Sequence, residues 1–262
     1  MVNILILIIF LIVFIYLIRK QRFININGTR RYTGNDKNTI ALIFHVGNIH
    51  VFYEIMNDYP RFFSSNIDIY ITVNNNENKD IVLNHFPNAY VKALPNKGMD
   101  IGPFLNTIQY IIEQNIEYDY YIKIHTKTDK NWRDEMLLPM SNNLDRITDT
   151  FSYKPYVYGS KKWFDTRNNL NDFHINKILQ RNYLEYQDNF ESCKHTGVIW
   201  GTCFIFNKAY FNELKKIKDF DYEQSILEEG YIVNSESRAT HAWEYFVGIP
   251  LCFHNSEIIT LE

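Results

Sequence analysis

From residue 39 onward, short apolar runs alternate with longer amphipathic stretches, and this alternation restricts the possible folds most strongly. The expected strands are residues 40–46, 67–73, 89–94 and 119–126, and the expected helices are residues 49–59, 78–85, 101–114 and 132–144. Strands that alternate with helices at this spacing predict an α/β fold with a mostly parallel, doubly wound sheet. Because ligands of such sheets bind beyond the carboxyl ends of the strands, candidate site residues should lie there.

The second half of the chain is less regular. Helices are expected at residues 171–186 and 240–246, and strands at residues 156–160, 202–206 and 248–253. No linker separates the two halves, so residues 39–262 are expected to form one domain. The composition is that of a globular protein, and a net charge of −3 gives no general attraction to nucleic acid.

The N-terminal segment Val2–Ile18 is almost wholly apolar and runs directly into a basic cluster at residues 19–22. At a rise of about 1.5 Å per residue, this length is at the short end of a membrane-spanning helix. A cleaved signal peptide or a buried helix is the alternative, but no basic start and no small-residue cleavage site are present. Residues 1–22 are therefore predicted to be a retained single-pass anchor, and the polar residues 23–38 a linker. The basic cluster predicts that the folded domain faces the cytosol.

The three cysteines, Cys193, Cys203 and Cys252, are odd in number and far apart. Their spacing matches neither a zinc site nor a disulfide framework. A reducing compartment is therefore expected.

A first motif spans residues 94–104 and lies between an expected strand and an expected helix. Gly98 and Gly102 allow close approach of the backbone to a ligand. Asp100 is expected to cap the helix, whose N-terminus offers free N–H groups to an anion. A well-formed turn without a ligand explains the spacing equally well. The motif is neither a P-loop nor a GxGxxG sequence.

A second motif spans residues 119–127. Strand alternation places Lys123, His125 and Lys127 on one face, together with Tyr121. Cations on a strand face are costly unless carboxylates or an anionic ligand neutralise them. An edge strand with a solvated face is the alternative, but the cations gather at the carboxyl end, which favours an anion site. Arg133 follows, and the paired N–H donors of its guanidinium group suit a phosphate.

Two further motifs occupy residues 201–206 and 240–246. In the latter, His241 and Glu244 are three residues apart and share one helical face. A carboxylate on a helix that faces a pocket can act as a general base. Spacing alone favours the alternative of a surface helix that packs Trp243 and Phe246 inward.

Together these motifs resemble the rhamnan synthesis protein F family. The matching segments are Pro95–Phe104, Lys123–Lys127 with Trp132-Arg133, Gly201–Phe204 and His241–Glu244, in the same order and at similar separations. The resemblance extends from about residue 40 to the C-terminus. It implies a GT-A-like, Rossmann-like fold that binds a nucleotide-sugar. It also implies a glycosyltransferase of the hexosyltransferase class, which moves a sugar from a donor such as dTDP-rhamnose to a glycan acceptor in polysaccharide synthesis.

On this interpretation each site residue takes a role. The expected donor-binding residues are His45, Asn96, Lys97, Gly98, Asp100, Gly102, Lys123 and Arg133. Lys127 and His125 are expected to stabilise charge on the leaving diphosphate. Glu244 is the candidate base, with His241 beside it. A single displacement with inversion is the simplest mechanism.

The sequence departs from the GT-A pattern at one place. Many GT-A enzymes carry an Asp-x-Asp after the fourth strand to hold a divalent metal, whereas His125-Thr126-Lys127 stands here. The only Asp-x-Asp, Asp219-Phe220-Asp221, lies in a polar stretch and is expected to be incidental. No metal ligand is therefore assigned, and a requirement for Mn²⁺ or Mg²⁺ is doubtful. The missing motif favours one alternative, a non-catalytic, membrane-anchored protein that binds carbohydrate or nucleotide-sugar. A phosphate-ester hydrolase is a third alternative, but it lacks an evident nucleophile.

Overall fold

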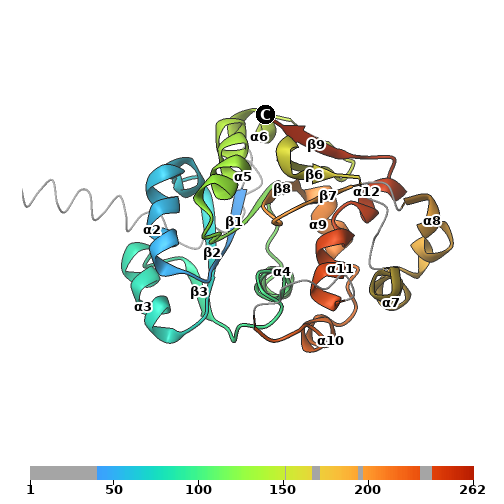
Figure 1. The fold of residues 1–262 in the computed structure, drawn as a ribbon, viewed down its shortest axis with the longest axis horizontal. Helices are drawn as coiled ribbons and strands as arrows, with labels where there is room; N and C mark the ends of the chain where they lie inside the picture. The colour runs from blue at the N-terminus through green and yellow to red at the C-terminus, as the bar shows by residue number, and fades with distance from the viewer. Residues whose placement is uncertain (1–39, 151, 167–171, 194–196, 231–237) are drawn as a thin grey trace, which may run out of the picture.

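A seven-stranded sheet forms the centre of the computed structural model, which describes residues 40–150, 152–166, 172–193, 197–230 and 238–262 (Figure 1). The strand order is β3-β2-β1-β4-β8-β5-β9. The strands are β1 (Ile40–Val46), β2 (Ile67–Val73), β3 (Tyr90–Ala93), β4 (Tyr120–His125), β5 (Val157–Ser160), β8 (Phe204–Asn207) and β9 (Ile258–Leu261). β8 runs antiparallel to both of its neighbours, and the other adjacent pairs are parallel. The predicted α/β class with a mostly parallel sheet is therefore confirmed.

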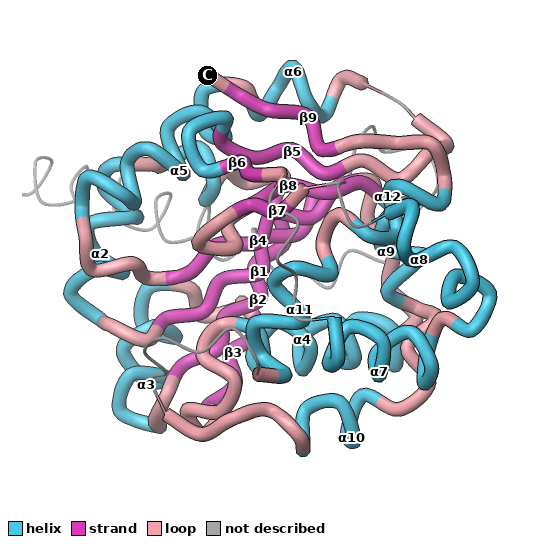
Figure 2. Tube along the Cα trace, turned by 45° about the vertical axis from the view of Figure 1, so that its right-hand side comes forward, coloured by secondary structure: helices cyan, strands magenta, loops and turns pink. Residues whose placement is uncertain are grey.

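Helices cover both faces of the sheet (Figures 1 and 2). One face packs against α2 (Ile49–Asp58), α3 (Asn76–His85) and α5 (Lys130–Asn142). The other face packs against α4 (Ile101–Glu113), α7 (Asp172–Asn182) and α11 (Ala239–Phe246). Strand alternation in β1 divides the core, because Leu42 and Phe44 point to the first layer and Ala41 and Ile43 to the second.

Short elements complete the described fold. They are the helices α6 (Leu144–Thr148), α8 (Phe190–Cys193), α9 (Lys208–Leu214), α10 (Phe220–Ser225) and α12 (Ile249–Phe253) and the 3₁₀ turns η1 (Pro60–Phe63), η2 (Lys161–Trp163) and η3 (Leu184–Asn189). A separate antiparallel pair consists of β6 (Phe164–Asp165) and β7 (Val198–Ile199).

Polar caps start the helices that follow β1 and β4. The Asn48 side chain accepts hydrogen bonds from the backbone N–H groups of His50 and Val51, at 2.9 and 3.3 Å, and begins α2. Asp129 accepts from the N–H of Trp132 at 2.9 Å and begins α5. Asp100 precedes α4, but its side chain makes no capping bond, so that prediction was wrong. Its carboxylate has other partners, described below.

Two regions of the second half differ from expectation. Residues 249–253, within a predicted strand, form helix α12, and the last strand is β9 at residues 258–261. A short apolar run cannot by itself distinguish a buried strand from a buried helix turn. The helix predicted over 171–186 is divided between α7 and η3.

A disulfide bond joins Cys193 of α8 to Cys252 of α12, which corrects the prediction that no disulfide framework exists. The two residues are 59 apart in sequence, and only the packing of α12 against α8 brings them together. This pairing removes the support that the cysteine count gave to a reducing compartment.

The predicted anchor, residues 1–22, and the predicted linker, residues 23–38, lie outside the described residues and stay predictions. Within the part of the chain that the structure describes, no helix is both long and apolar enough to span a bilayer.

Candidate functional site

A cleft of about 1040 Å³ opens where β1 and β4 end, at the carboxyl edge of the parallel strands. Seven residues selected from the sequence line it, namely His45, Asn96, Asp100, His125, Lys127, His241 and Glu244. They come from β1, the loop before α4, β4 and the loop after it, and α11. The fold thus brings together motifs that are up to about 200 residues apart in the chain.

A buried ion pair lies beneath the cleft. The Lys123 ammonium bonds to the Asp100 carboxylate, and also donates to the backbone oxygen and the hydroxyl of Thr202, at 2.8 and 3.0 Å. Lys123 is 2% exposed and does not line the cleft, so it acts on a ligand only through Asp100. β4 lies between β1 and β8, which rules out the edge-strand alternative. Burial alone would raise the pKa of Asp100, but Lys123 and His125 outweigh it and hold that pKa below its usual range.

His125 lies directly above this pair and carries a positive charge at neutral pH. Burial opposes the charge, but the nearby Asp100 carboxylate raises the pKa of His125 to about 9. The Nε2 atom of His125 lies 2.7 Å from the carbonyl oxygen of Gly201, which can only accept, so Nε2 donates. His45 is the opposite case. Burial lowers the pKa of His45 to about 4, and its neutral ring bonds Thr72 through Nδ1 at 3.0 Å.

The ammonium of Lys127 lies 3.3 Å from the ring centroid of Trp132, a cation–π contact at the wall of the cleft. Burial lowers the pKa of Lys127. The backbone of Lys127 is held by Arg133, whose Nη1 donates to the Lys127 carbonyl at 2.7 Å. Arg133 is 1% exposed, and its Nη2 atom bonds to Glu54 of α2. Arg133, expected to bind phosphate, therefore lies behind the cleft and positions the loop that carries Lys127.

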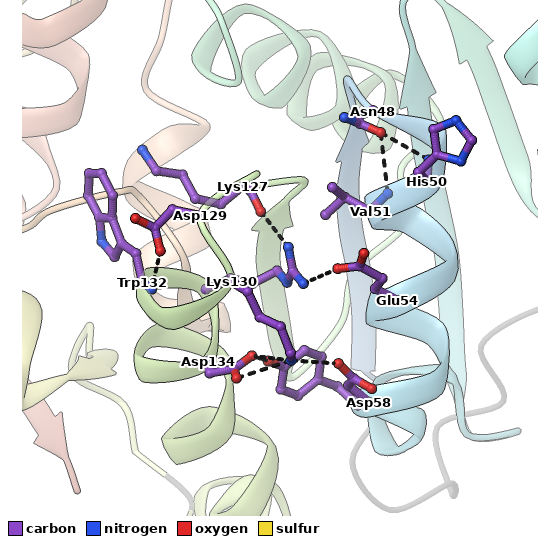
Figure 3. A network of polar contacts seen from close by, with 12 residues as sticks. Asn48, His50, Val51, Glu54, Asp58, Lys127, Asp129, Lys130, Trp132 and Asp134 are labelled. Carbon is purple, nitrogen blue, oxygen red and sulfur yellow. Dashed lines mark hydrogen bonds and ion pairs between the residues drawn. The ribbon is translucent and has the colours of Figure 1, made fainter.

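The same network joins α5 to α2 (Figure 3). Lys130 of α5 bonds to Asp58 of α2 at 3.0 Å and to Asp134 at 3.1 Å. The Tyr59 hydroxyl, at the end of α2, donates to Asp134. These contacts hold the helix that follows β4 against the helix that follows β1.

The helix α11 carries Glu244 and His241 into the cleft one turn apart, while Trp243 and Phe246 pack into the core. Burial, together with the nearby Asp100 carboxylate, raises the pKa of Glu244 to about 8, although Lys123, His125 and Lys127 oppose this shift. Burial lowers the pKa of His241, and its Nδ1 atom has no hydrogen-bond partner among the residues that the structure describes. Trp243 and Phe246 pack inward as the surface-helix alternative expects, and the opposite face of α11 forms one wall of the cleft.

The N-terminus of α11 is held by Glu228. This carboxylate accepts from the backbone N–H groups of Ala239 and Thr240 at 2.8 and 3.1 Å, and from the Thr240 hydroxyl at 2.6 Å. The backbone oxygen of Glu228 also accepts from the N–H of Gly98 at 2.7 Å. One short segment therefore links the loop before α4 to the helix that carries Glu244.

Three residues expected to bind the donor shape this loop without lining the cleft. Gly98 has a φ of +69°, and a Cβ there would lie 2.5 Å from Leu227. A Cβ on Gly102 would lie 2.1 Å from the backbone oxygen of Lys97. The ammonium of Lys97 bonds to the Ser225 carbonyl at 2.6 Å. The glycines thus serve close packing within the protein.

Several lining residues were not selected from the sequence. Asn74 directly follows β2 and Asn48 is the second residue after β1, so the rule that ligands bind at strand carboxyl ends could have found them. Trp163 and Trp200 line the opposite end of the cleft. No sequence signal pointed to these two, because the short strand pair β6–β7 that brings them together was not predictable.

The Asp-x-Asp at residues 219–221 has structural partners, in keeping with the expectation that it is incidental. Asp219 caps α10 by accepting from the N–H of Tyr222 at 2.8 Å, and Asp221 accepts from Gln109 at 3.2 Å. Over the described ranges, no three His, Cys, Asp or Glu side chains are grouped as metal ligands.

Residues 11–247 match the rhamnan synthesis protein F family. The chain therefore belongs to this family, which confirms the resemblance found in the motifs. Membership associates the chain with rhamnan synthesis, and hence with polysaccharide biosynthesis. No curated protein and no solved structure matches it.

Proposed function

We propose that this chain is a glycosyltransferase that moves a hexosyl unit from a nucleotide-sugar donor to a hydroxyl group of a glycan acceptor. The observation that carries the proposal is the juxtaposition, in one cleft at the carboxyl edge of the sheet, of fixed cations and a carboxyl group with a raised pKa. Membership in a rhamnan synthesis family supports a rhamnose or related deoxysugar donor. The mostly parallel sheet is compatible with the GT-A-like fold that the family resemblance implies.

The donor diphosphate binds, in this proposal, against His125 and Lys127. His125 is positively charged at neutral pH, and Lys127 reaches the cleft wall from a braced loop. Asp100 and Lys123 are positioning residues, since the Asp100 carboxylate stabilises the charge on His125 and Lys123 holds that carboxylate in place. Preorganised charges of this kind need no reorganisation when negative charge develops on a leaving group.

The chemical step is a single displacement at the anomeric carbon. The acceptor hydroxyl gives its proton to the Glu244 carboxylate as its oxygen bonds to the anomeric carbon. The bond between that carbon and the diphosphate oxygen breaks, and its electron pair leaves on the diphosphate. His125 and Lys127 stabilise the charge that appears there. The carboxyl of Glu244 is suited to this role because its pKa, about 8, lies near the working pH.

The residues beside the proposed diphosphate site do not fit a divalent cation. Asp100 is already bonded to Lys123 and Thr202, and Asp129 caps α5. His125 is protonated at neutral pH, and a metal ligand must be a neutral imidazole. We therefore derive no step through a metal, and expect transfer to survive EDTA.

The test uses the full-length protein with a panel of nucleotide-sugars that begins with dTDP-rhamnose. A donor that binds the folded state raises the melting temperature by mass action. Release of nucleoside diphosphate on adding acceptor then reports transfer. A melting shift without any diphosphate release would refute the transferase and favour the alternative, a protein that binds nucleotide-sugar without turnover. No shift with any donor would refute both.

We also propose that residues 1–22 anchor the protein and that the catalytic domain faces the cytosol. Recovery of the intact full-length chain in the soluble fraction without detergent would contradict the anchor. Protection of the domain from protease in sealed vesicles of cytosolic-side-out orientation would contradict its placement.

A further inference from the structure

Three of the four tryptophans in the chain, Trp132, Trp163 and Trp200, line the same end of the cleft. Trp132 and Trp163 stack with their ring centroids 4.6 Å apart and their planes inclined by 29°. The fourth, Trp243 of α11, is 5% exposed and packs into the hydrophobic core of the protein. Large aromatic surfaces left at a cleft wall, rather than in the core, indicate a binding surface.

The small sheet β6–β7 fixes the position of two of these rings. Trp163 immediately precedes β6 and Trp200 immediately follows β7, and the Trp200 N–H donates to the Trp163 carbonyl at 2.9 Å. The indole N–H of Trp200 donates to Asp165 at 3.2 Å. The Trp200 ring also meets Tyr245 of α11 edge to face, with centroids 5.5 Å apart. The two rings are thus held rigidly.

This end of the cleft lies near the proposed base, because Glu244 directly precedes Tyr245 in α11. The opposite end is formed by Gly47, Asn48 and Asn74 at the ends of β1 and β2. Backbone and amide groups suit the hydrogen-bonding edges of a nucleotide. A nucleotide bound at that end leaves the tryptophan end of the cleft for the acceptor.

We propose that Trp163 and Trp200 form a stacking platform for a pyranose ring of the acceptor glycan. A pyranose presents a face of C–H groups, whose partial positive charge suits the negative face of an indole ring. Lys127 already lies over the Trp132 ring, which leaves Trp163 and Trp200 as the ligand-facing pair.

This proposal rests on the transferase function but is tested separately from it. The full-length protein, handled without sugar-headed detergents, is labelled with fluorotryptophan, and its four resonances are assigned by single Trp→Phe substitutions. Rhamnose oligosaccharides are then titrated. We expect the Trp163 and Trp200 resonances to shift and that of the buried Trp243 to stay. In transfer assays, Trp163→Ala should raise the acceptor KM by roughly tenfold, with donor KM and hydrolysis of the donor by water within about twofold of the parent.

Two variants serve as controls. Trp163→Phe retains an aromatic face and should recover most of the acceptor affinity, which separates stacking from loss of fold. Phe173→Ala removes an aromatic side chain that is 66% exposed and lies outside the cleft lining, and should leave both KM values unchanged.

The outcomes separate the two proposals. A Trp163→Ala protein with weaker donor binding and an unchanged acceptor KM would overturn the platform, because the ring would then stack on the nucleobase. Unshifted Trp163 and Trp200 resonances at saturating oligosaccharide would overturn it as well. Oligosaccharide-induced shifts in a protein that neither binds nor cleaves any donor would retain the platform and refute the transferase.

Discussion

Replacing Glu244 by Gln tests the base directly, because the structure predicts the shape of the pH profile. In the proposed mechanism Glu244 must be deprotonated and His125 protonated for transfer, and their pKa values are about 8 and about 9. At pH 7 roughly a tenth of the molecules have both groups in the required state. At pH 8.5 this fraction is roughly six-tenths, and by pH 10 it falls back to roughly a tenth. The profile of kcat/KM should therefore be a bell with its maximum near pH 8.5, about sixfold above the rate at pH 7.

The assay follows nucleoside diphosphate release between pH 6 and 10.5, with the donor at a concentration far below KM. Glu244→Gln should lower kcat/KM by roughly 10²–10⁴ and remove the ascending limb, since the amide does not titrate in this range. Glu257→Gln changes an exposed carboxylate outside the cleft and should leave the bell intact. A flat profile from pH 7 to 9, or an ascending limb that survives in Glu244→Gln, would refute the assignment of the base.

Three further predictions follow from the charges around the cleft. Lys127→Ala should lower turnover by roughly 10²–10³ with little change in melting temperature, whereas Lys154→Ala, which changes an exposed lysine outside the cleft, should not slow transfer. Asp100→Ala leaves the Lys123 ammonium buried without its carboxylate, so urea unfolding should show that the free energy of unfolding falls by roughly 3–5 kcal/mol. The double variant Asp100→Ala, Lys123→Met should lose less free energy of unfolding, and an equal loss would contradict the pairing. Glu244 has a folded-state pKa raised above its unfolded value, so its contribution to stability is present below about pH 4.5 and lost as pH rises through about 8. The melting temperature of Glu244→Gln should therefore exceed that of the parent increasingly from pH 5 to pH 9, and a constant difference would contradict the raised pKa.

The first half of the fold was predictable because its signals are local. The expected strands at residues 40–46 and 67–73 coincide with β1 and β2, since apolar runs between turns suffice to define buried parallel strands. The later part of the sheet depends on contacts distant in sequence. The run at residues 248–253 could be a strand or a helix by its pattern, and only packing against α8 and α9 makes it α12.

The site was predictable where charge at a strand end carried the signal. Lys123 and His125 were found because cations on a central strand need a partner, and that partner proved to be Asp100. Arg133 was assigned to phosphate because its chemistry suits it, but burial directs its guanidinium to Glu54 and a backbone carbonyl. Sequence indicates what a side chain can bind, and burial decides which partner it reaches. The tryptophan wall escaped prediction because it depends on a two-residue strand pair.

The reversed strand β8 has a consequence for how this fold can diversify. Because β5 ends and β8 begins at the same edge of the sheet, the chain between Ser160 and Phe204 leaves and returns at one place. In the topology of the sheet, this segment is the connection between two antiparallel neighbouring strands, and the register of those strands does not restrict its length. It nevertheless carries the rings that we assign to the acceptor. The part of this segment that precedes Gly201 is thus an exchangeable cassette, through which a lineage, or an engineer, can change the accepted glycan, while Gly201 and Thr202 keep their bonds to His125 and Lys123.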